Sequence, residues 1–339
     1  MRATLRRLRQ RGSGDPEDGP RAARTDGGQP GWSLPAPVAR LRSGVNDRFG
    51  ADFLESSPFW FPPFLLVGLF VYGAILWNLV ISLTDFSGFA REPDYGDLDL
   101  DNYVRAATDS TVVDAGVNTV LLLVGFTLAT LAVGLALAIL VDRGIRFENT
   151  VRTIYLLPMS LSFVVTAQFW LWLYDFNNGI VNILIGTVGI GPVDWIGNQS
   201  IVLWAVVFAL VWQFSGYAMV VYLAGLRAIP RETYEAARVD GASTLTMYWR
   251  VIVPQLKGAT ISASVVLMVF ALKAFDFLFS LVSSFRPPSG ADILATKMVR
   301  EAYGNTNWAY GATIEIILFA MALSIVGPYL VYQYRRGNL

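Results

Sequence analysis

The sequence contains no cysteine and no histidine in its 339 residues. Disulfides, thiolate nucleophiles, Cys/His zinc sites and catalytic arrangements built on histidine are therefore excluded. The only lysines follow leucine or threonine, so no Gly-Lys pair can form a phosphate-binding Walker A loop: Lys257, Lys273 and Lys297. We therefore expect a chain that is not an enzyme, has no catalytic or metal-binding residues, and binds no cofactor itself.

Charge is also scarce, because only 15% of the residues are charged while 54% are apolar. Soluble domains carry about 25% charged residues. The 26 basic and 26 acidic residues balance, so nothing in the overall charge favours nucleic acid as a partner. The composition instead predicts that lipid surrounds much of the chain.

The first 57 residues differ from the rest of the chain in composition. They are rich in Arg, Gly and Pro and lack the apolar residues needed for a core, so we expect a largely disordered tail. A cleaved signal peptide is not expected, because the first apolar run begins only near Phe59 and is long. Residues 58–339 are expected to form one transmembrane domain.

A helix needs about 20 mostly apolar residues to cross the hydrocarbon core of a bilayer. Six stretches meet this requirement: residues 59–83, 116–141, 152–174, 200–224, 259–284 and 311–333. A β-barrel would instead show alternating segments of about 10 residues. The sequence therefore predicts an all-α membrane protein with six transmembrane helices.

The distribution of basic residues predicts the orientation of these helices. If the N-terminus is cytoplasmic, the cytoplasmic segments hold 20 of the 26 Lys and Arg residues, the external loops hold 5, and Lys273 lies within a span. Basic residues are retained on the cytoplasmic side of a membrane. We expect a multi-pass protein of the cell membrane with both termini in the cytoplasm.

The loop between the fourth and fifth spans, about residues 228–257, reads as helical rather than as a simple linker. Pro230 suits a first helical position, Glu232 and Glu235 favour the positive end of a helix, and Gly241 can end it in a left-handed conformation. One interpretation of this loop is an ordinary amphipathic segment lying on the membrane surface.

After the turn at Gly241, a second helix is predicted. Ser243 can cap it, and Pro254 is expected to end or kink it before the next span.

The residue pattern of this loop favours another interpretation. Glu235-Ala236-Ala237, Gly241 and Val251-Ile252-Val253-Pro254 have the spacing of the EAA loop, so the chain resembles the permease subunits of binding-protein-dependent ABC importers. Val251 and Val253 stand where that family prefers Ile and Leu. The resemblance implies a coupling helix that docks on an ATPase subunit, with these residues involved: Glu235, Ala236, Ala237, Asp240, Gly241 and Pro254.

Other stretches narrow the resemblance to carbohydrate permeases of the maltose type, with similarity to their α-glucoside branch. They include Leu156-Leu-Pro-Met159, Leu223-Ala-Gly-Leu-Arg-Ala-Ile-Pro230 and Ala295-Thr-Lys-Met298. Phe285-Arg-Pro-Pro-Ser-Gly290 replaces the usual Gly-Gly-Pro turn after the fifth span, which leaves the sugar open. The resemblance implies a second homologous permease subunit, two ATPase subunits that hold ATP and Mg, and an extracytoplasmic solute-binding protein. Alternating access is the implied mechanism.

Polar residues within spans are candidates for the substrate pathway. Lys273 and Asp276 are spaced to share one face of the fifth span, where they would either lock two helices together as a pair or face the substrate. Trp172 belongs to an aromatic group typical of a headgroup-level belt, although sugars also stack on such rings. Three further candidates offer hydrogen-bonding groups within spans: Gln168, Gln213 and Tyr217.

Three alternative functions remain at this point. A permease of the same class could carry a solute other than a sugar. A proton- or sodium-coupled transporter would need intramembrane carboxylates such as Asp276 and Glu315 as ion sites, but would have no use for the cytoplasmic helix pair. A membrane-embedded enzyme would lack obvious catalytic residues.

Overall fold

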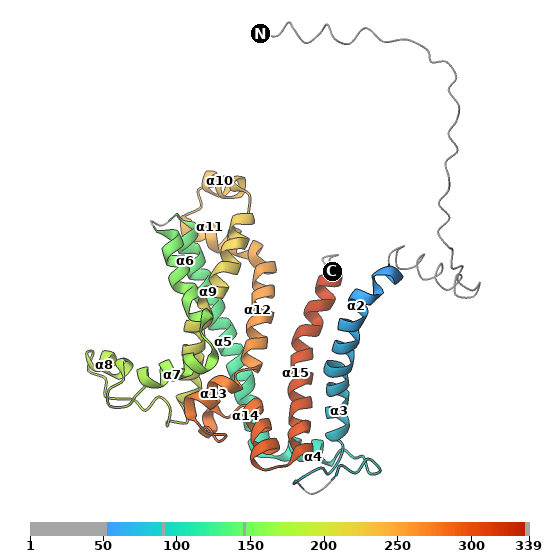
Figure 1. Ribbon diagram of the computed structural model, residues 1–339. Helices are drawn as coiled ribbons and strands as arrows, with labels where there is room; N and C mark the ends of the chain where they lie inside the picture. The colour runs from blue at the N-terminus through green and yellow to red at the C-terminus, as the bar shows by residue number, and fades with distance from the viewer. Residues whose placement is uncertain (1–52, 90–91, 145–146, 336–339) are drawn as a thin grey trace, which may run out of the picture. The chain divides into compact units, whose positions relative to one another are not determined.

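The computed structural model describes residues 53–89, 92–144 and 147–335 (Figure 1). The chain divides into two compact units, residues 1–68 and 69–339. The predicted tail of residues 1–57 lies almost entirely outside the described residues, and the first unit is represented by helix α2 (Phe53–Val67).

All regular elements in the described ranges are helical. In chain order the second unit contains α3 (Gly73–Ile81), α4 (Asp101–Thr108), α5 (Ser110–Asp142), α6 (Glu148–Leu156), α7 (Phe163–Leu173), α8 (Ile180–Gly186), α9 (Val202–Ala228), α10 (Arg231–Val239), α11 (Thr244–Met247), α12 (Lys257–Leu272), α13 (Phe275–Val282), α14 (Leu294–Val299) and α15 (Trp308–Arg335). The short turns are π-helical η1 (Gly68–Tyr72), η3 (Tyr248–Ile252) and η6 (Arg300–Gly304), and 3-10 η2 (Leu157–Ser160), η4 (Val253–Leu256) and η5 (Ser289–Ala291).

Within the described part of the chain, five continuous helical segments are long and apolar enough to cross a membrane. They are Ser56–Ile81, Ser110–Asp142, Val202–Ala228, Thr244–Leu272 and Trp308–Arg335. Each overlaps one of the predicted spans, so the all-α membrane fold predicted from the sequence is confirmed. The multi-pass character of the chain follows directly from these lengths.

The third predicted span, residues 152–174, is not one straight helix. Its two halves, Glu148–Ser160 and Phe163–Leu173, meet at an angle of 101°. Pro158 lies in the 3-10 turn at this break, and the Ser162 hydroxyl accepts a hydrogen bond from the backbone N–H of Val165 at 3.3 Å. A residue without an N–H followed by a new N-cap explains why the helix stops and restarts.

The fifth predicted span, residues 259–284, starts close to the first residue of α12 but is wrong at its C-terminal end. The helical segment begins at Thr244 and ends at Leu272, and α13 is a separate helix. Lys273 and Asp276 therefore lie on either side of a break rather than on one helical face. Both side chains are exposed, and no ion pair joins them among the described residues.

The centre of the second unit is the crossing of α5 and α9. A Cβ added to Gly134 would overlap the Cβ of Ala218, so the two backbones approach more closely there than a side chain allows. Ala138, one turn after Gly134, is also buried, whereas Ala132 and Ala136 are exposed. The helical period brings only residues three or four apart to one face, which explains this division of a small-residue stretch.

Replacing Gly134 with alanine is expected to destabilise the fold by about 1–3 kcal/mol, because an extra methyl group must be accommodated in a filled contact. Gly116 lies on the same helix with nothing within 4 Å of its added Cβ. Gly116→Ala should therefore be neutral or stabilise by up to about 1 kcal/mol. Unfolding of the purified protein, followed by tryptophan fluorescence, measures both variants, and equal stability of the two would contradict the close contact.

Candidate functional site

The first candidate site is the helix pair between α9 and α12. Helix α10 lies at one end of the second unit, beyond the ends of α5, α6 and α9 (Figure 1). It begins after Pro230, which is the N-cap rather than the first helical residue, and ends before Asp240. Gly241 follows in the left-handed region with φ +76°, as the sequence predicted, and a Cβ added there would have nothing within 4 Å.

Helix α10 is solvated on one side and packed on the other. Glu235 and Ala236 are exposed, together with Asp240 and Gly241 after the helix end. Ala237 is buried in the main hydrophobic core, so it packs α10 against the rest of the unit and is not part of the exposed face. The exposed side of α10 therefore combines the small Ala236 with acidic and basic side chains, such as Glu235 and Arg238.

Hydrogen bonds connect this helix pair to the spans. The Tyr234 hydroxyl donates to the Leu226 carbonyl at 3.5 Å, and the Tyr248 hydroxyl donates to an Asp142 carboxylate oxygen at 3.2 Å. Burial, helped by the nearby Asp142 carboxylate, raises the pKa of Tyr234 to about 12. Its hydroxyl therefore remains a proton donor throughout the physiological range.

A polar pocket of about 780 Å³ lies beneath α10. Glu235 and Asp142 line it with four arginines: Arg143, Arg227, Arg231 and Arg238. Arg227 also pairs with Glu148 at the start of α6. A displacement of α10 would therefore act on the ends of α5, α6 and α9 together.

The segment after α10 continues directly into a span. The Ser243 hydroxyl accepts a hydrogen bond from the Thr246 backbone N–H at 3.3 Å, which confirms the predicted cap. Helical structure then runs from Thr244 to Leu272, so Pro254 does not end it. Pro254 lies in a 3-10 turn that follows a π-helical turn, and such local adjustments accommodate the missing N–H. Of the two predicted outcomes at Pro254, an end or a kink, the helix end is therefore wrong, and the helix after Ser243 continues into the span.

The second candidate site is a pocket of about 330 Å³ beside the break in the third span. Gln213 and Asp276 supply its strongest polar groups, and its apolar lining includes Met159, Phe214 and Phe270. Gln213 is 2% exposed, and its side-chain N–H donates to the Leu161 carbonyl at 3.0 Å. Its carbonyl oxygen is buried without a partner within the described residues. An acceptor of this kind suits a ligand hydroxyl.

The other predicted pathway residues lie elsewhere. Gln168 donates to the Ser280 carbonyl at 2.7 Å and so ties α7 to α13. Trp172 is 74% exposed on the outside of α7, a position that suits a lipid-facing ring. Tyr217, one turn after Gln213 on α9, packs half-buried against the core. The structure therefore brings together Gln213 and Asp276 from the predicted set.

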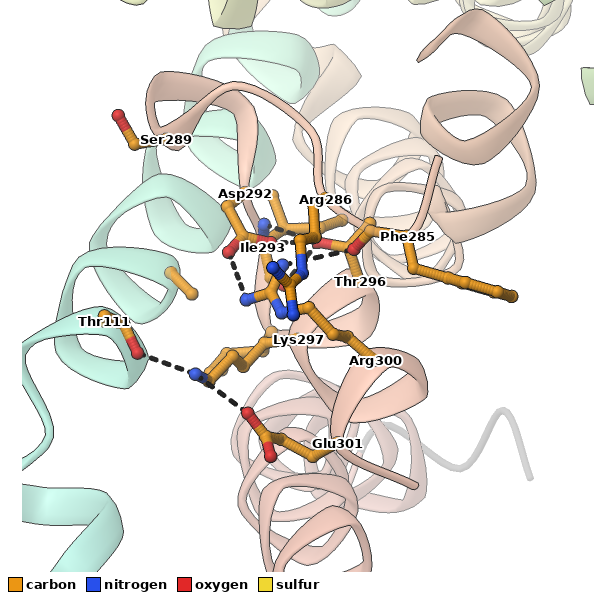
Figure 2. Close-up of polar contacts among 12 residues, drawn as sticks. Thr111, Phe285, Arg286, Ser289, Asp292, Ile293, Thr296, Lys297, Arg300 and Glu301 are labelled. Carbon is orange, nitrogen blue, oxygen red and sulfur yellow. Dashed lines mark hydrogen bonds and ion pairs between the residues drawn. The ribbon is translucent and has the colours of Figure 1, made fainter. Parts of the chain in front are cut away.

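A third site, a cluster of charged and polar side chains, lies at the end of the second unit that is remote from α10. Lys297, with a side chain 8% exposed, donates to the Thr111 hydroxyl at 2.7 Å and pairs with Glu301 at 3.0 Å (Figure 2). Arg300 pairs with Asp292 at 2.6 Å. This cluster fastens the segment after α13 to the first turn of α5.

Asp109 completes the cluster as the N-cap of α5. It faces Lys297 at 3.8 Å and accepts a hydrogen bond from the Tyr310 hydroxyl at 3.0 Å. Burial alone would raise the pKa of Asp109, but hydrogen bonds from Thr111 and Tyr310 hold it below its usual value. Sequence reasoning missed this cluster, although the i,i+4 spacing of Lys297 and Glu301 was a signal for a pair.

Neutralising Glu301 should lower the stability of the fold, and the loss measures how much this cluster contributes. Glu301→Gln leaves Lys297 buried with weaker partners, and breaking a buried pair costs about 3–5 kcal/mol, so we expect a loss near the lower end because Asp109 remains. Arg152→Gln breaks a partly exposed i,i+4 pair with Glu148 at 3.6 Å and should cost less than about 1 kcal/mol. Thermal unfolding distinguishes them, and a loss no larger than that of Arg152→Gln would contradict the buried pair.

Comparison with known proteins places these features in a family. Residues 130–337 match the family described as binding-protein-dependent transport system inner membrane component. The chain belongs to this family.

Two relatives and one solved structure extend the comparison. The xylose/arabinose import permease protein XacH of Haloferax volcanii is 56% identical, covering 91% of this chain and 94% of its own. The trehalose/maltose transport system permease protein MalF of Thermococcus litoralis is 30% identical over 60% of this chain and 68% of its own. A chain of a bacterial alginate ABC transporter, solved with a pentasaccharide-bound periplasmic protein, aligns with TM-score 0.71 at 20% identity, covering 86% of this chain and 97% of that one. The last similarity shows that the two chains share a fold.

Proposed function

We propose that this chain is the permease subunit of an ATP-driven carbohydrate importer. The observation that carries the proposal is the 56% identity to a xylose/arabinose import permease over 91% of the chain. A pentose is therefore the first sugar to test, ahead of the α-glucosides, whose permease from Rhizobium meliloti is 29% identical over 60% of the chain.

In this proposal α10 is the coupling helix. Its exposed Glu235 and Ala236 would face a cleft on an ATPase subunit, with Glu235 placed for a basic partner. The left-handed Gly241 supports this role because it turns the chain without adding a side chain to the docking face. ATP and Mg would be held by two such ATPase subunits.

Movement of α10 would be transmitted to the pocket at Gln213 by the helical segment that starts at Thr244. This segment ends at Leu272, next to the break that positions Asp276 on the pocket wall. The pocket's carboxylate and its buried amide oxygen suit the hydroxyls of a sugar, and its aromatic rings suit the apolar C–H faces. A second permease subunit would complete the pathway, and a solute-binding protein would deliver the sugar. Both termini are assigned to the cytoplasmic side by the distribution of basic residues.

A non-sugar solute of the same importer class is the second candidate. The osmoprotective compounds uptake permease protein GgtC of Synechocystis is 31% identical over 70% of this chain. An ion-coupled transporter is a weaker candidate, because it would have no use for the exposed helix α10 between two spans.

Uptake in membrane vesicles tests the energy source. We expect labelled sugar to enter only with ATP, and vanadate to abolish entry in the presence of the partner subunits and binding protein. A proton or sodium gradient that drove uptake without ATP would exclude an ATP-driven importer.

A further inference from the structure

The segment between α7 and α9, which includes α8, has an apolar exposed surface. Residues 176–193 contain no charged side chain. Helix α8 places Ile180, Ile183 and Leu184 on one face, and all three are exposed. Val188, which follows the helix, is 73% exposed. Isolated exposed apolar residues are ordinary, but a continuous uncharged face of this kind indicates a contact.

The opposite face of α8 is fixed by a single buried asparagine. The Asn182 side-chain N–H groups donate to the carbonyls of Phe176 and Val193, both at 3.0 Å. Its side-chain oxygen accepts from the Val193 backbone N–H at 3.1 Å and from the Trp195 indole N–H at 2.8 Å. The Asn182 side chain is therefore fully hydrogen-bonded within its own loop. These hydrogen bonds fix the Asn182 side of α8 against the loop. The opposite side, with Ile180, Ile183 and Leu184, is therefore exposed.

The loop is anchored at the end of a span. Trp195 stacks on Tyr174 with ring centroids 5.6 Å apart, and the Tyr174 hydroxyl donates to the Ala205 carbonyl at 2.9 Å. Ala205 is within the first turn of α9, about 5 Å along the helix from its start at a rise of about 1.5 Å per residue. Helix α8 therefore lies beside the end of α9 remote from α10, to one side of the central helices (Figure 1).

We infer that the exposed face of α8 is a lipid contact, inserted in the membrane interface at the end of the spans remote from α10. Aromatic residues at its base suit the headgroup level, and interfacial helices bury their apolar face about 5–10 Å into the boundary between headgroups and acyl chains.

The chemistry of the face favours lipid over a protein partner. A soluble binding protein must dock and leave, and such transient interfaces carry about as much polar surface as the rest of a protein. The outer face of α8 offers no charged side chain, and its Thr187 hydroxyl already donates to the Leu184 carbonyl at 2.6 Å. The preceding helix α7 also exposes apolar side chains, including Val165 and Trp172.

Spin labelling tests this assignment without prior removal of native cysteines from this chain, because the chain has none. Ile183→Cys receives a nitroxide label in the assembled transporter in lipid nanodiscs. Gln199→Cys, an exposed polar position in the loop before α9, serves as the matched control. We expect the label at Ile183 to be broadened by oxygen and protected from a water-soluble nickel complex, and the label at Gln199 to show the reverse.

Two results would overturn the inference. Access of the nickel complex to both labels would place α8 in water. Protection of Ile183 from both oxygen and nickel would place it against a protein, either the second permease subunit or the binding protein. A second label at Leu184→Cys guards against a local disturbance at one position, because both residues share the exposed face and must give the same result.

Discussion

Gly241→Asp should insert and fold normally but lose stable association with the ATPase subunits. A non-glycine residue in the left-handed region costs about 1–2 kcal/mol, and an aspartate would add charge and bulk to the proposed docking face. A loss of about 1.4 kcal/mol in binding already corresponds to tenfold, so we expect copurification of the ATPase, and ATP turnover coupled to transport, to fall by at least about tenfold. Affinity purification through this chain, with quantification of the ATPase, measures the effect.

Gly144 provides a matched control for this variant. It also has φ +76° with nothing within 4 Å of an added Cβ, but it lies in the turn after α5 and outside the helix pair. Gly144→Asp imposes the same backbone strain and the same new charge without touching α10. Full coupling in Gly241→Asp, or an equal loss in Gly144→Asp, would contradict the assignment of α10 as the coupling helix.

Asp276→Asn should weaken sugar uptake while leaving the assembly intact. The Asp276 carboxylate lines the pocket and has no ion-pair partner within the described ranges, so its removal disturbs no internal bond. A hydrogen bond to a charged group contributes about 1.5–3 kcal/mol, so we expect the sugar concentration for half-maximal uptake to rise at least about tenfold.

An exposed loop carboxylate controls for the change of charge. Asp194 accepts a hydrogen bond from the Gly197 backbone N–H at 2.7 Å, and asparagine retains that acceptor. Asp194→Asn should transport like the native chain, and both variants should copurify with the ATPase. Unchanged uptake by Asp276→Asn would remove this pocket from the substrate pathway.

The spans could be predicted from the sequence because the bilayer imposes both their length and their apolar composition. The turn at Gly241 and the cap at Ser243 could also be predicted, since each depends on local backbone chemistry. The roles of the EAA residues came from a residue pattern and stay a prediction. Their structural setting agrees with an exposed helix, apart from the burial of Ala237.

The breaks in the third and fifth spans could not be predicted in the same way. Pro158 was a visible signal, but proline is also tolerated inside membrane helices, so it did not decide between a kink and a break. The break between α12 and α13 consists of Lys273 and Ala274, and neither is a helix-breaking residue. The separation of α13 reflects tertiary contacts, such as the Gln168 bond to the Ser280 carbonyl, that no local pattern encodes.

The polar cluster around Lys297 was missed for a related reason. Lys297 and Thr111 are 186 positions apart in the chain, and only the fold brings them together. Lys297 entered the sequence analysis as a loop charge that bears on the predicted orientation, and that role carried no information on its packing.

Uptake of labelled sugars by cells with and without this gene tests the central claim most directly. The panel contains xylose, arabinose, maltose and an α-glucoside, with an oligopeptide as the control solute. We predict that deletion abolishes entry of one sugar or a related pair, with the pentoses first, and that the gene restores it while the peptide is unaffected. Normal entry of every sugar together with loss of the peptide would contradict a carbohydrate importer and leave only the family assignment standing.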